Sequence, residues 1–260
     1  MTGDQMFLFG LFGVAFVLFV WDKVRYDLVA FAALLIAAPA TAQSLQAQYE
    51  AFLEGTIWPE AKLAGVSRAN FDKAMGAKRL NTDIPGLVAP GSKEPPREMR
   101  QAEFSAPAKY FNERNLGYVT ATGRSLARQH ASTLAAVEKA YGVPGRIIVA
   151  IWGRESGFGK VKIPHDAFQV LGTKAFMSTR PDLFRRELIN ALVIVQLGRA
   201  SASEMRSSWA GALGQPQFMP SSYLQYAVDF DRNGHPDIWN SVPDTLGSIG
   251  ACLQQSGWGQ

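Results

Sequence analysis

The sequence predicts a mainly α-helical domain that follows an apolar segment at the amino terminus. Several stretches carry apolar residues at the spacing of a helix with one buried face, and none keeps the alternation of a half-buried strand for long. Of the 260 residues, 47% are hydrophobic and 18% are charged, which is typical of a globular protein with an added apolar stretch. We therefore expect residues 1–42 to be targeting or membrane material and residues 43–260 to form one helical domain with little β structure.

Two apolar runs occupy the amino-terminal segment. The first, 6–21, is marginal for a spanning helix, whereas the second, 28–40, has the length of a signal-peptide core and is followed by a small-x-small sequence. Two alternatives follow. The segment is either a leader cut after Ala42 or a helical hairpin anchored in the inner membrane, with Lys23 and Arg25 in its cytoplasmic turn. Both alternatives place the remaining chain outside the cytoplasm.

The net charge of +4 and the single cysteine narrow the classes of partner and site. A modest positive excess favours a polyanionic partner or an anionic surface. No Lys/Arg-rich run with interleaved aromatic residues is present, so no nucleic acid partner is expected. Because Cys252 is the only cysteine, a disulfide framework and a cysteine-based zinc site are excluded within one chain.

Short helices alternate with helix-breaking glycine and proline residues in the first part of the domain. Residues 45–53 are expected to form an amphipathic helix that ends near Gly55, and Ser67 caps the start of another short helix. Six proline and glycine residues within 81–97 predict an extended loop that wraps the main body. Residues 108–118 are rich in aromatic side chains, which either pack in the core or stack on sugars.

Longer helices are predicted in the second half of the chain. A long helix is expected over residues 122–140, where Gly142 supplies a C-cap and Pro144 is favourable in the first turn of the next helix. Residues 167–176 and 181–198 predict two more helices, and the second of these is apolar enough to be central.

The helix that follows Pro144 carries one carboxylate at its carboxyl end. Glu155 follows Ile151 by four residues and Trp152 by three, so it is expected on the apolar face, and Gly157 then ends the helix. Apolar surroundings and the negative end of the helix dipole both disfavour the anion. We therefore expect the protonated carboxyl group to be favoured, as a general acid near neutral pH requires. The alternative is a solvated residue at a helix end.

The segment 207–223 has the composition of a binding loop. Two glycines, two prolines, two glutamines and four serines surround a few large apolar side chains. Such a loop exposes backbone, amide groups and aromatic rings, which suit a neutral ligand rich in hydroxyl and amide groups. The alternative is an ordinary surface loop before a helix that starts near Ser221.

Two long motifs occur in a fixed order along the chain. Residues 152–159 read Trp-Gly-Arg-Glu-Ser-Gly-Phe-Gly, and residues 208–221 read Ser-Trp-Ala-Gly-Ala-Leu-Gly-Gln-Pro-Gln-Phe-Met-Pro-Ser. With Tyr-Gly-Val-Pro at 141–144 and Phe-Arg-Arg-Glu-Leu at 184–188, they resemble the lytic murein transglycosylase B family, glycoside hydrolase family 103. The resemblance implies a lysozyme-like helical fold that acts in the periplasm on peptidoglycan strands. It also implies a monomer that requires no cofactor for its chemistry.

The resemblance further implies roles for individual residues. Glu155 matches the sole catalytic carboxylate, Ser208 the serine that hydrogen-bonds it, and Gln217 the glutamine that holds the substrate near the cleaved bond. Glu155 would protonate the oxygen between N-acetylmuramic acid (MurNAc) and N-acetylglucosamine (GlcNAc), then accept the proton of the C6 hydroxyl, giving a 1,6-anhydro product. The residues expected to bind substrate are Ser208, Gln215, Gln217, Phe218 and Tyr223.

Other functions compatible with the same sequence are a hydrolytic muramidase that admits water and a non-catalytic peptidoglycan-binding module. The chain ends at Gln260, whereas members of the family continue with more of the substrate groove. We therefore expect a domain that is short at its carboxyl end.

Residues 229–240 fit the first part of an EF-hand calcium loop. Oxygen-bearing side chains occupy positions 1, 3, 5 and 9, and glycine occupies position 6. The usual glutamate at position 12 is replaced by Asn240, and a more distant aspartate could complete the shell. The expected ligands of a structural Ca²⁺ are Asp229, Asp231, Asn233, the backbone carbonyl of His235, Asp237 and Asp244. The alternative is an Asx-rich turn that binds no metal.

Overall fold

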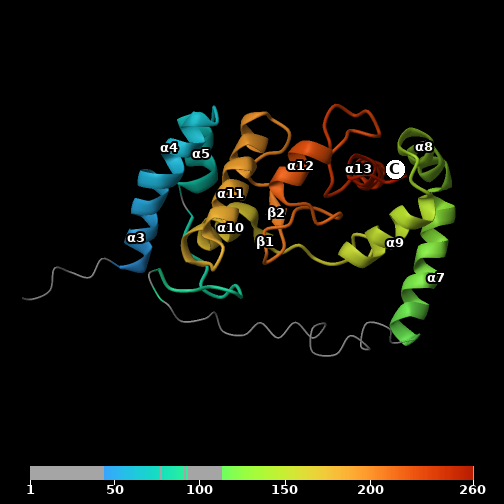
Figure 1. The fold of residues 1–260 in the computed structure, drawn as a ribbon, viewed down its shortest axis with the longest axis horizontal. Coiled ribbons are helices and arrows are strands. Elements are labelled where there is room, and N and C mark those ends of the chain that lie inside the picture. Colours follow the sequence, from blue (N-terminus) through green and yellow to red (C-terminus); the bar gives the residue numbers. More distant parts are fainter. Residues whose placement is uncertain (1–43, 77, 91, 93–112, 260) are drawn as a thin grey trace, which may run out of the picture. The chain divides into compact units, whose positions relative to one another are not determined.

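The computed structural model (Figure 1) describes residues 44–76, 78–90, 92 and 113–259. The two apolar runs and the expected cleavage point after Ala42 lie outside these residues. Contacts along the backbone divide the chain into two units, residues 1–47 and residues 48–260. No helix in the described part of the chain has the length and hydrophobicity needed to cross a bilayer.

Helices dominate the described structure, which confirms the mainly α fold. The two short strands, β1 (His165–Asp166) and β2 (Arg206–Ser207), pair in an antiparallel manner. A π-helix, η1 (Leu53–Ile57), lies between α3 and α4. The α-helices are α3 (Leu45–Phe52), α4 (Trp58–Leu63), α5 (Arg68–Met75), α7 (Glu113–Gln129), α8 (Ala131–Tyr141), α9 (Gly145–Ser156), α10 (Ala167–Met177), α11 (Pro181–Gln196), α12 (Pro220–Tyr226) and α13 (Val242–Gln255).

Two helix boundaries differ from those expected. The chain stays helical through Gly55, because η1 connects α3 to α4. Pro59 lies in the first turn of α4, where its missing N–H removes no helical hydrogen bond. The single helix expected over 122–140 is two helices, because the backbone leaves helical geometry at His130 (φ −104°, ψ 24°). Neither glycine nor proline marks that break, so the sequence carried no local signal for it.

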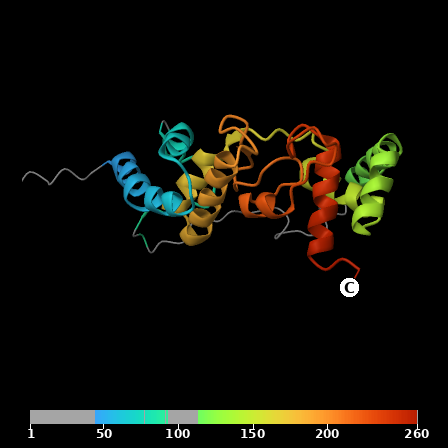
Figure 2. The same cartoon turned by 90° about the horizontal axis from the view of Figure 1, so that it is seen from above.

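The larger hydrophobic core surrounds α10. Nine of the eleven residues of α10 are buried, so this helix is covered on all sides. Helix α11 packs directly against it (Figures 1 and 2) and contributes Leu188 and Leu192 to the core. Tyr49 from α3 and Phe71 from α5 join the same cluster. Helix α11, which was expected to be central, has six buried residues and also packs against α4, α5 and α12.

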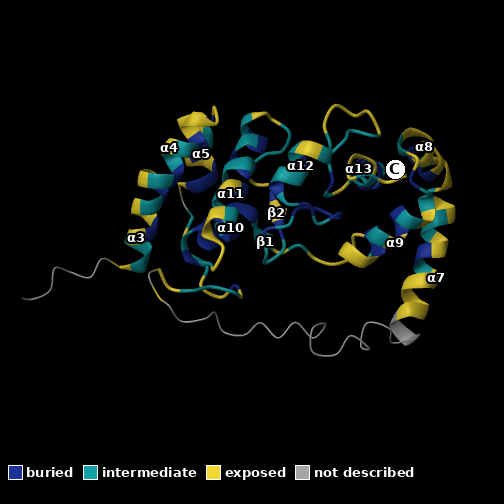
Figure 3. Cartoon of the chain, viewed as in Figure 1, coloured by how far each residue is buried: buried dark blue, intermediate teal, exposed yellow. Residues whose placement is uncertain are grey.

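A second, smaller core joins α8, α9 and α13. Leu134 of α8, Ile148 of α9 and Leu246 of α13 are among its buried members. Gly250 of α13 allows a close approach, since a Cβ atom there would lie 2.7 Å from Cγ1 of Val137. Helix α9 packs in this core with one face, whose residues are buried, whereas Arg154 and Glu155 near its carboxyl end are exposed (Figure 3). This core therefore fixes the helix that carries the candidate catalytic residue.

Lys174 is an unusual member of the larger core, because its side chain is only 3% exposed. Its Nζ donates a hydrogen bond to the carbonyl oxygen of Pro85 (2.8 Å). It also lies 5.3 Å from the ring centre of Phe184 and 5.1 Å from that of Trp209. Within the described residues it forms no ion pair with a carboxylate. Burial lowers the pKa of the Lys174 ammonium group, because it penalises the charged form.

This burial predicts a pH dependence of stability. Between the lowered folded pKa and the ordinary value of 10.5, the unfolded chain binds more protons at Lys174 than the folded chain does. The free energy of unfolding of the wild type should therefore rise with pH in this window, relative to that of Lys174→Met. Urea unfolding of both proteins at about pH 8 and about pH 10 measures the difference. A difference that stays constant or changes in the opposite direction would contradict the assignment.

Candidate active site

Glu155 is the second-to-last residue of α9, and Gly157 ends the helix in the left-handed region (φ 56°), as expected. The carboxylate is exposed, so the apolar surroundings predicted for it are absent. The reason is the helical row that turns inward, which runs through Ile148, Trp152 and Ser156 at intervals of four residues. Glu155 lies beside that row and is exposed to solvent.

A buried hydrogen bond joins α9 to the loop of the second motif. The indole Nε1–H of Trp152 donates to Oε1 of Gln215 (2.7 Å), although the two residues are 63 positions apart. The Nε2 group of Gln215 donates to the carbonyl oxygen of Trp239 (3.0 Å). Gly159 leaves the space that this arrangement needs, since a Cβ atom there would lie 2.4 Å from Oε1 of Gln215. The structure thus brings together the two motifs that the sequence singled out.

Residues 213–218 form a closed loop, which we call the glutamine loop. Leu213 and Phe218 close it with reciprocal backbone hydrogen bonds of 2.6 and 3.0 Å. Gln217 has a left-handed backbone (φ 54°), which is uncommon for a residue with a side chain, and its Nε2 group donates to the carbonyl oxygen of Gly214 (2.8 Å). Backbone strain of this kind is concentrated at functional sites.

Ser208 begins the segment that leads into the glutamine loop. Its Oγ accepts hydrogen bonds from the backbone N–H groups of Ala210 (3.3 Å) and Ala212 (3.2 Å). Ser208 and Gln217 are both partly exposed. In the described part of the chain, no hydrogen bond connects either residue to Glu155. The hydrogen bond between Ser208 and Glu155 therefore remains a prediction.

Three other residues expected to bind substrate are turned inward. Tyr223 is fully buried, and its hydroxyl donates to the carbonyl oxygen of Pro236 (2.8 Å). Phe218 is 9% exposed and packs edge-on against Tyr226, and Gln215 is 7% exposed with both ends of its amide bonded to protein. Because Tyr223 offers no surface to a ligand, we no longer expect it to contact substrate. All three support the loop from inside.

Glu187 is a residue of the site that the sequence reasoning missed. It lies on α11 and is 6% exposed. Its Oε1 accepts a hydrogen bond from the Ser221 hydroxyl (2.7 Å), and its Oε2 accepts one from the Ser221 backbone N–H (2.8 Å). Ser221 lies three residues after the end of the glutamine loop, in the first turn of α12. The available signal was the segment 184–188, which carries part of the family resemblance and contains this glutamate.

Removal of this carboxylate should destabilise the protein. Glu187→Ala leaves the partly buried N–H of Ser221 without its carboxylate acceptor and removes two charge-assisted hydrogen bonds. The expected loss in the free energy of unfolding is about 3 kcal/mol. Glu187→Gln keeps one acceptor oxygen and should lose less. Urea unfolding of the three proteins tests the order, and equal stability of Glu187→Ala and the wild type would contradict it.

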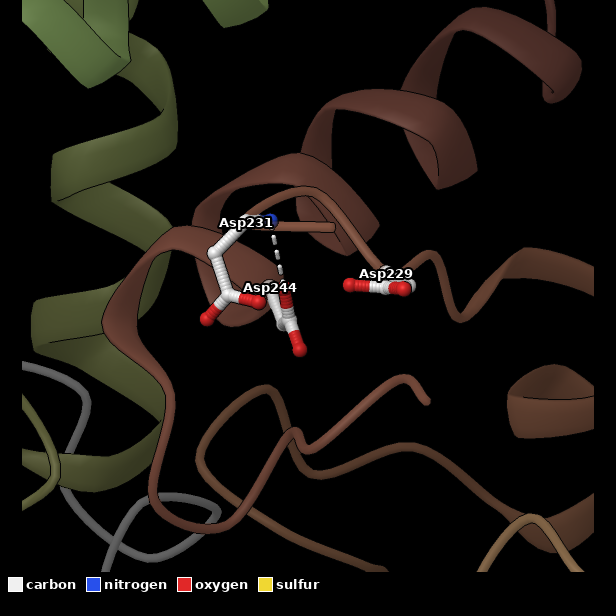
Figure 4. A group of neighbouring side chains, drawn as sticks. All are labelled: Asp229, Asp231 and Asp244. Carbon is white, nitrogen blue, oxygen red and sulfur yellow. Dashed lines mark hydrogen bonds between the residues drawn. The ribbon is translucent and has the colours of Figure 1, made fainter. Parts of the chain in front are cut away.

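Three carboxylates lie close together in the loop before α13 and at its start (Figure 4). Asp229, Asp231 and Asp244 each place an oxygen within 4.8 Å of the others. Asp244 lies in the first turn of α13 and is fully buried. Its Oδ1 accepts hydrogen bonds from the backbone N–H groups of Phe230 (2.8 Å) and Asp231 (3.1 Å), and its Oδ2 accepts one from that of Asp237 (2.8 Å). Asp244 thus organises the whole loop from its base.

The geometry of these carboxylates fits a hard cation. Calcium takes oxygen ligands at about 2.3–2.6 Å, so ligand atoms on one ion are separated by up to about 5 Å. Desolvation raises the pKa of Asp229, but hydrogen bonds outweigh this and hold the pKa below its usual value. They come from the backbone N–H groups of Gly234, Asn233 and Arg232, together with the side chain of Asp231. Asp229 is therefore an anion at neutral pH, as a calcium ligand must be.

Asp237 is not among the three converging carboxylates, and coordination by the Asn233 side chain and the His235 carbonyl stays a prediction. The carboxylate of Asp237 is turned to the backbone N–H groups of Trp239 (3.0 Å) and Asn240 (2.9 Å). The side-chain oxygen of Asn233 accepts a hydrogen bond from the backbone N–H of His235 (3.3 Å). The structure thus brings together the three expected carboxylate ligands Asp229, Asp231 and Asp244, whereas the carboxylate of Asp237 bonds to the turn that follows it.

Comparison with known proteins shows which family the chain belongs to. Residues 48–260 match the family model described as the transglycosylase SLT domain. The chain belongs to this family. The resemblance to lytic murein transglycosylase B that the two motifs carry is thereby confirmed.

The chain is similar to one relative by sequence and to several proteins of known structure. Membrane-bound lytic murein transglycosylase B of Escherichia coli is 37% identical over 131 residues, which are 50% of this chain and 36% of that protein. SltB3 from Pseudomonas aeruginosa, solved in complex with NAG-NAM-pentapeptide, has a TM-score of 0.69 at 32% identity and covers 82% of this chain. Escherichia coli Slt35, solved in complex with calcium, has a TM-score of 0.58 at 25% identity and covers 84% of this chain.

The chain spans only part of the length of these relatives. It covers 36% of the length of the first, 55% of SltB3 and 64% of Slt35. The likeness to SltB3 supports the helical fold over most of the described residues.

Proposed function

We propose that the protein is a peptidoglycan lytic transglycosylase, which cleaves the bond between MurNAc and GlcNAc and leaves 1,6-anhydro-MurNAc ends. One observation carries this proposal. The exposed carboxylate of Glu155 lies at the end of a helix that the buried Trp152–Gln215 hydrogen bond ties to the glutamine loop. The solved complexes of SltB3 with NAG-NAM-pentapeptide and NAG-anhNAM-pentapeptide support the class of substrate and product.

A single carboxylate is sufficient for this reaction. Glu155 donates its proton to the glycosidic oxygen, the bond to C1 of MurNAc breaks, and the 2-acetamido group of the sugar stabilises the positive charge. The carboxylate then accepts the proton of the C6 hydroxyl while that oxygen bonds to C1. Common glycosidases need a second carboxylate to activate water or to act as nucleophile. Here the attacking hydroxyl belongs to the same sugar ring, so proximity supplies that advantage.

The exposure of Glu155 has a place in this scheme. A glycan strand that covers the end of α9 would exclude water from the carboxyl group and so favour its protonated form. The apolar surroundings expected from the sequence would then be supplied by the substrate. In this proposal Ser208 hydrogen-bonds the carboxylate, and the partly exposed Gln217 holds an acetamido group near the cleaved bond.

The proposal is tested by incubating the protein with purified sacculi and measuring both binding and release of soluble fragments. Sedimentation with the sacculi measures binding, and chromatography of the supernatant measures release. A lytic transglycosylase binds and releases fragments. Binding without release would instead support a non-catalytic peptidoglycan-binding module.

We also propose a structural Ca²⁺ held by Asp229, Asp231 and Asp244. The calcium complex of Slt35 supports this assignment. The ion would offset the repulsion of three converging carboxylates. It lies in a loop whose Asp237–Trp239 part accepts the amide of Gln215, so its role is to stabilise the support of the active site.

Calcium should therefore raise the thermal stability of the protein. At a concentration about 100 times the dissociation constant, the added free energy is about 2.7 kcal/mol, which raises Tm by roughly 5–10 °C. Calorimetry of the wild type with Ca²⁺ and with a chelator measures the shift. Asp231→Asn removes one proposed ligand and should reduce the shift. A Tm that is independent of Ca²⁺ would contradict the proposal that these carboxylates bind Ca²⁺.

For location, we propose that residues 43–260 act in the periplasm, with residues 1–42 as a cleaved leader or as an inner-membrane anchor. The apolar runs and the similarity to the membrane-bound lytic murein transglycosylase B of Escherichia coli support export. The intact mass of the exported protein distinguishes the two forms. A mass that lacks residues 1–42 indicates cleavage, and a full mass in the membrane fraction indicates an anchor.

A further inference from the structure

We propose that Gln215 is a positioning residue, which fixes the carboxyl end of α9 against the glutamine loop. Its amide makes no contact with the glycan in this proposal; it acts through Trp152 on the turn that carries Glu155. The inference rests on the proposed transglycosylase activity and replaces the expectation that Gln215 binds substrate.

The chemistry of the two partners explains why this position is an amide. The indole N–H of Trp152 is only a donor, and the backbone carbonyl of Trp239 is only an acceptor. An amide offers an acceptor oxygen to the first (2.7 Å) and a donor N–H to the second (3.0 Å) in one fixed orientation. A carboxylate would satisfy the indole but would repel the carbonyl oxygen. A methionine would satisfy neither.

The hydrogen bond reaches the turn that carries Glu155. Trp152 lies one helical turn before Glu155 and packs edge-on against Phe158 (ring centres 5.5 Å apart, 87°). Its carbonyl oxygen accepts the hydroxyl of Ser156 (3.3 Å), which in turn accepts the backbone N–H of Gly159 (3.0 Å). The residues that follow Glu155 are therefore linked back to Trp152, which precedes it.

The same turn also contacts Gln215 directly. Gly159 has a left-handed backbone (φ 75°), and a Cβ atom at this position would lie 2.4 Å from Oε1 of Gln215 and 2.8 Å from its Cδ. The Gln215 side chain therefore occupies the space next to the backbone of Gly159. The backbone of Gln215 is also held, because its N–H donates to the carbonyl oxygen of Ile238 (2.8 Å). The side chain and the backbone N–H of Gln215 together thus set the spacing between the end of α9, the glutamine loop and residues 238–239.

Such spacing matters to a reaction with a single acid and base. A displacement of about 1 Å of a catalytic group costs roughly 10²-fold in rate. Loss of a positioning residue that does not touch the substrate should lower kcat and leave KM unchanged. Loss of a substrate contact should raise KM. The two roles of Gln215 therefore predict different kinetics.

The test compares Gln215→Met with a matched control, Gln196→Met. Gln196 also uses its side-chain oxygen as a bridge, accepting hydrogen bonds from the backbone N–H of Ser67 (2.9 Å) and from the side chain of Asn70 (2.7 Å). Both variants lose a bridging glutamine, but Gln196 joins α11 to α5, away from the site. We expect Gln215→Met to lower kcat on sacculi by roughly 10²-fold with KM unchanged, and Gln196→Met to keep wild-type kinetics.

Gln215→Glu supplies a second signature. When the introduced carboxyl group is ionised, it repels the carbonyl oxygen of Trp239. When it is protonated, its O–H donates to that carbonyl oxygen, as the wild-type amide does. Activity of this variant relative to the wild type should therefore recover as the pH falls. If Gln215→Met does not fold, Trp152→Phe removes the same hydrogen bond from the other partner and replaces it in the test.

Hydrogen exchange makes the test independent of activity. In Gln215→Met, exchange should accelerate at the backbone amides of residues 157–159 and at those of the glutamine loop. In Gln196→Met, exchange should stay at the wild-type rate in both regions. If the wild type itself releases no fragments, the proposed function fails and exchange alone decides the positioning role. Wild-type kcat in folded Gln215→Met, a rise in KM alone, or faster exchange confined to the glutamine loop would each overturn the inference.

Discussion

Glu155→Gln is expected to reduce the release of soluble fragments from peptidoglycan by roughly 10²- to 10⁴-fold. The substitution keeps the shape of the side chain but removes the proton that the leaving oxygen requires. It also removes the base that the C6 hydroxyl requires. Because Glu155 is exposed and its buried neighbours are unchanged, stability should stay within about 0.5 kcal/mol of the wild type. Fragment release and urea unfolding, measured on one preparation, test both statements.

Glu138→Gln is the matched control for this variant. Glu138 is an exposed glutamate on α8 that accepts a hydrogen bond from the backbone N–H of Gly145 (3.1 Å), and glutamine retains an oxygen for that bond. The control makes the same change in net charge near the other end of α9 and should keep full activity. Substantial activity in Glu155→Gln would remove this residue from the chemistry. Loss of binding to sacculi in that variant would assign it to recognition instead.

Asp244→Ala is expected to lower the free energy of unfolding by on the order of 3–6 kcal/mol. The carboxylate is fully buried and accepts three backbone N–H groups, from Phe230, Asp231 and Asp237. Each donor left unpaired costs roughly 1–3 kcal/mol. Urea unfolding in the presence of a chelator isolates this contribution from that of any bound ion.

Asp231→Ala is the comparison that separates the two roles of the acidic cluster. Asp231 is exposed, and its carboxylate accepts hydrogen bonds from the Ser241 hydroxyl (2.7 Å) and the Asn233 N–H (3.1 Å). Both variants should lose the stabilisation by Ca²⁺, but only Asp244→Ala should be strongly destabilised in calcium-free buffer. Equal stability of the two variants under those conditions would show that Asp244 is not the base of the loop.

The ends of the helices were predictable because their causes are local. Gly142 and Gly157 adopt left-handed conformations at the ends of α8 and α9, and Ser67 accepts the N–H of Asn70 at the start of α5. Each signal depends only on a few neighbouring residues. The break at His130 depends on how α7 and α8 pack on α9, so no local residue type announces it.

The orientation of side chains within the site was less predictable for a physical reason. Two adjacent rows of α9 carry large apolar residues, and the choice of the inner row is made by the helices that pack on it. The row with Trp152 and Ser156 is inside, which leaves Glu155 exposed. In the second motif, composition identified a functional loop but did not distinguish Gln217, which is partly exposed, from Gln215, which is buried.

The chemical identity of the released ends tests the central claim most directly. Purified sacculi are digested with the protein, and the soluble fragments are analysed by mass spectrometry without prior reduction. If Glu155 acts alone with the C6 hydroxyl as nucleophile, the MurNAc ends carry the 1,6-anhydro ring and are lighter than reducing ends by one water. Fragments that end in reducing MurNAc would show that water is the nucleophile and would contradict the single-carboxylate mechanism.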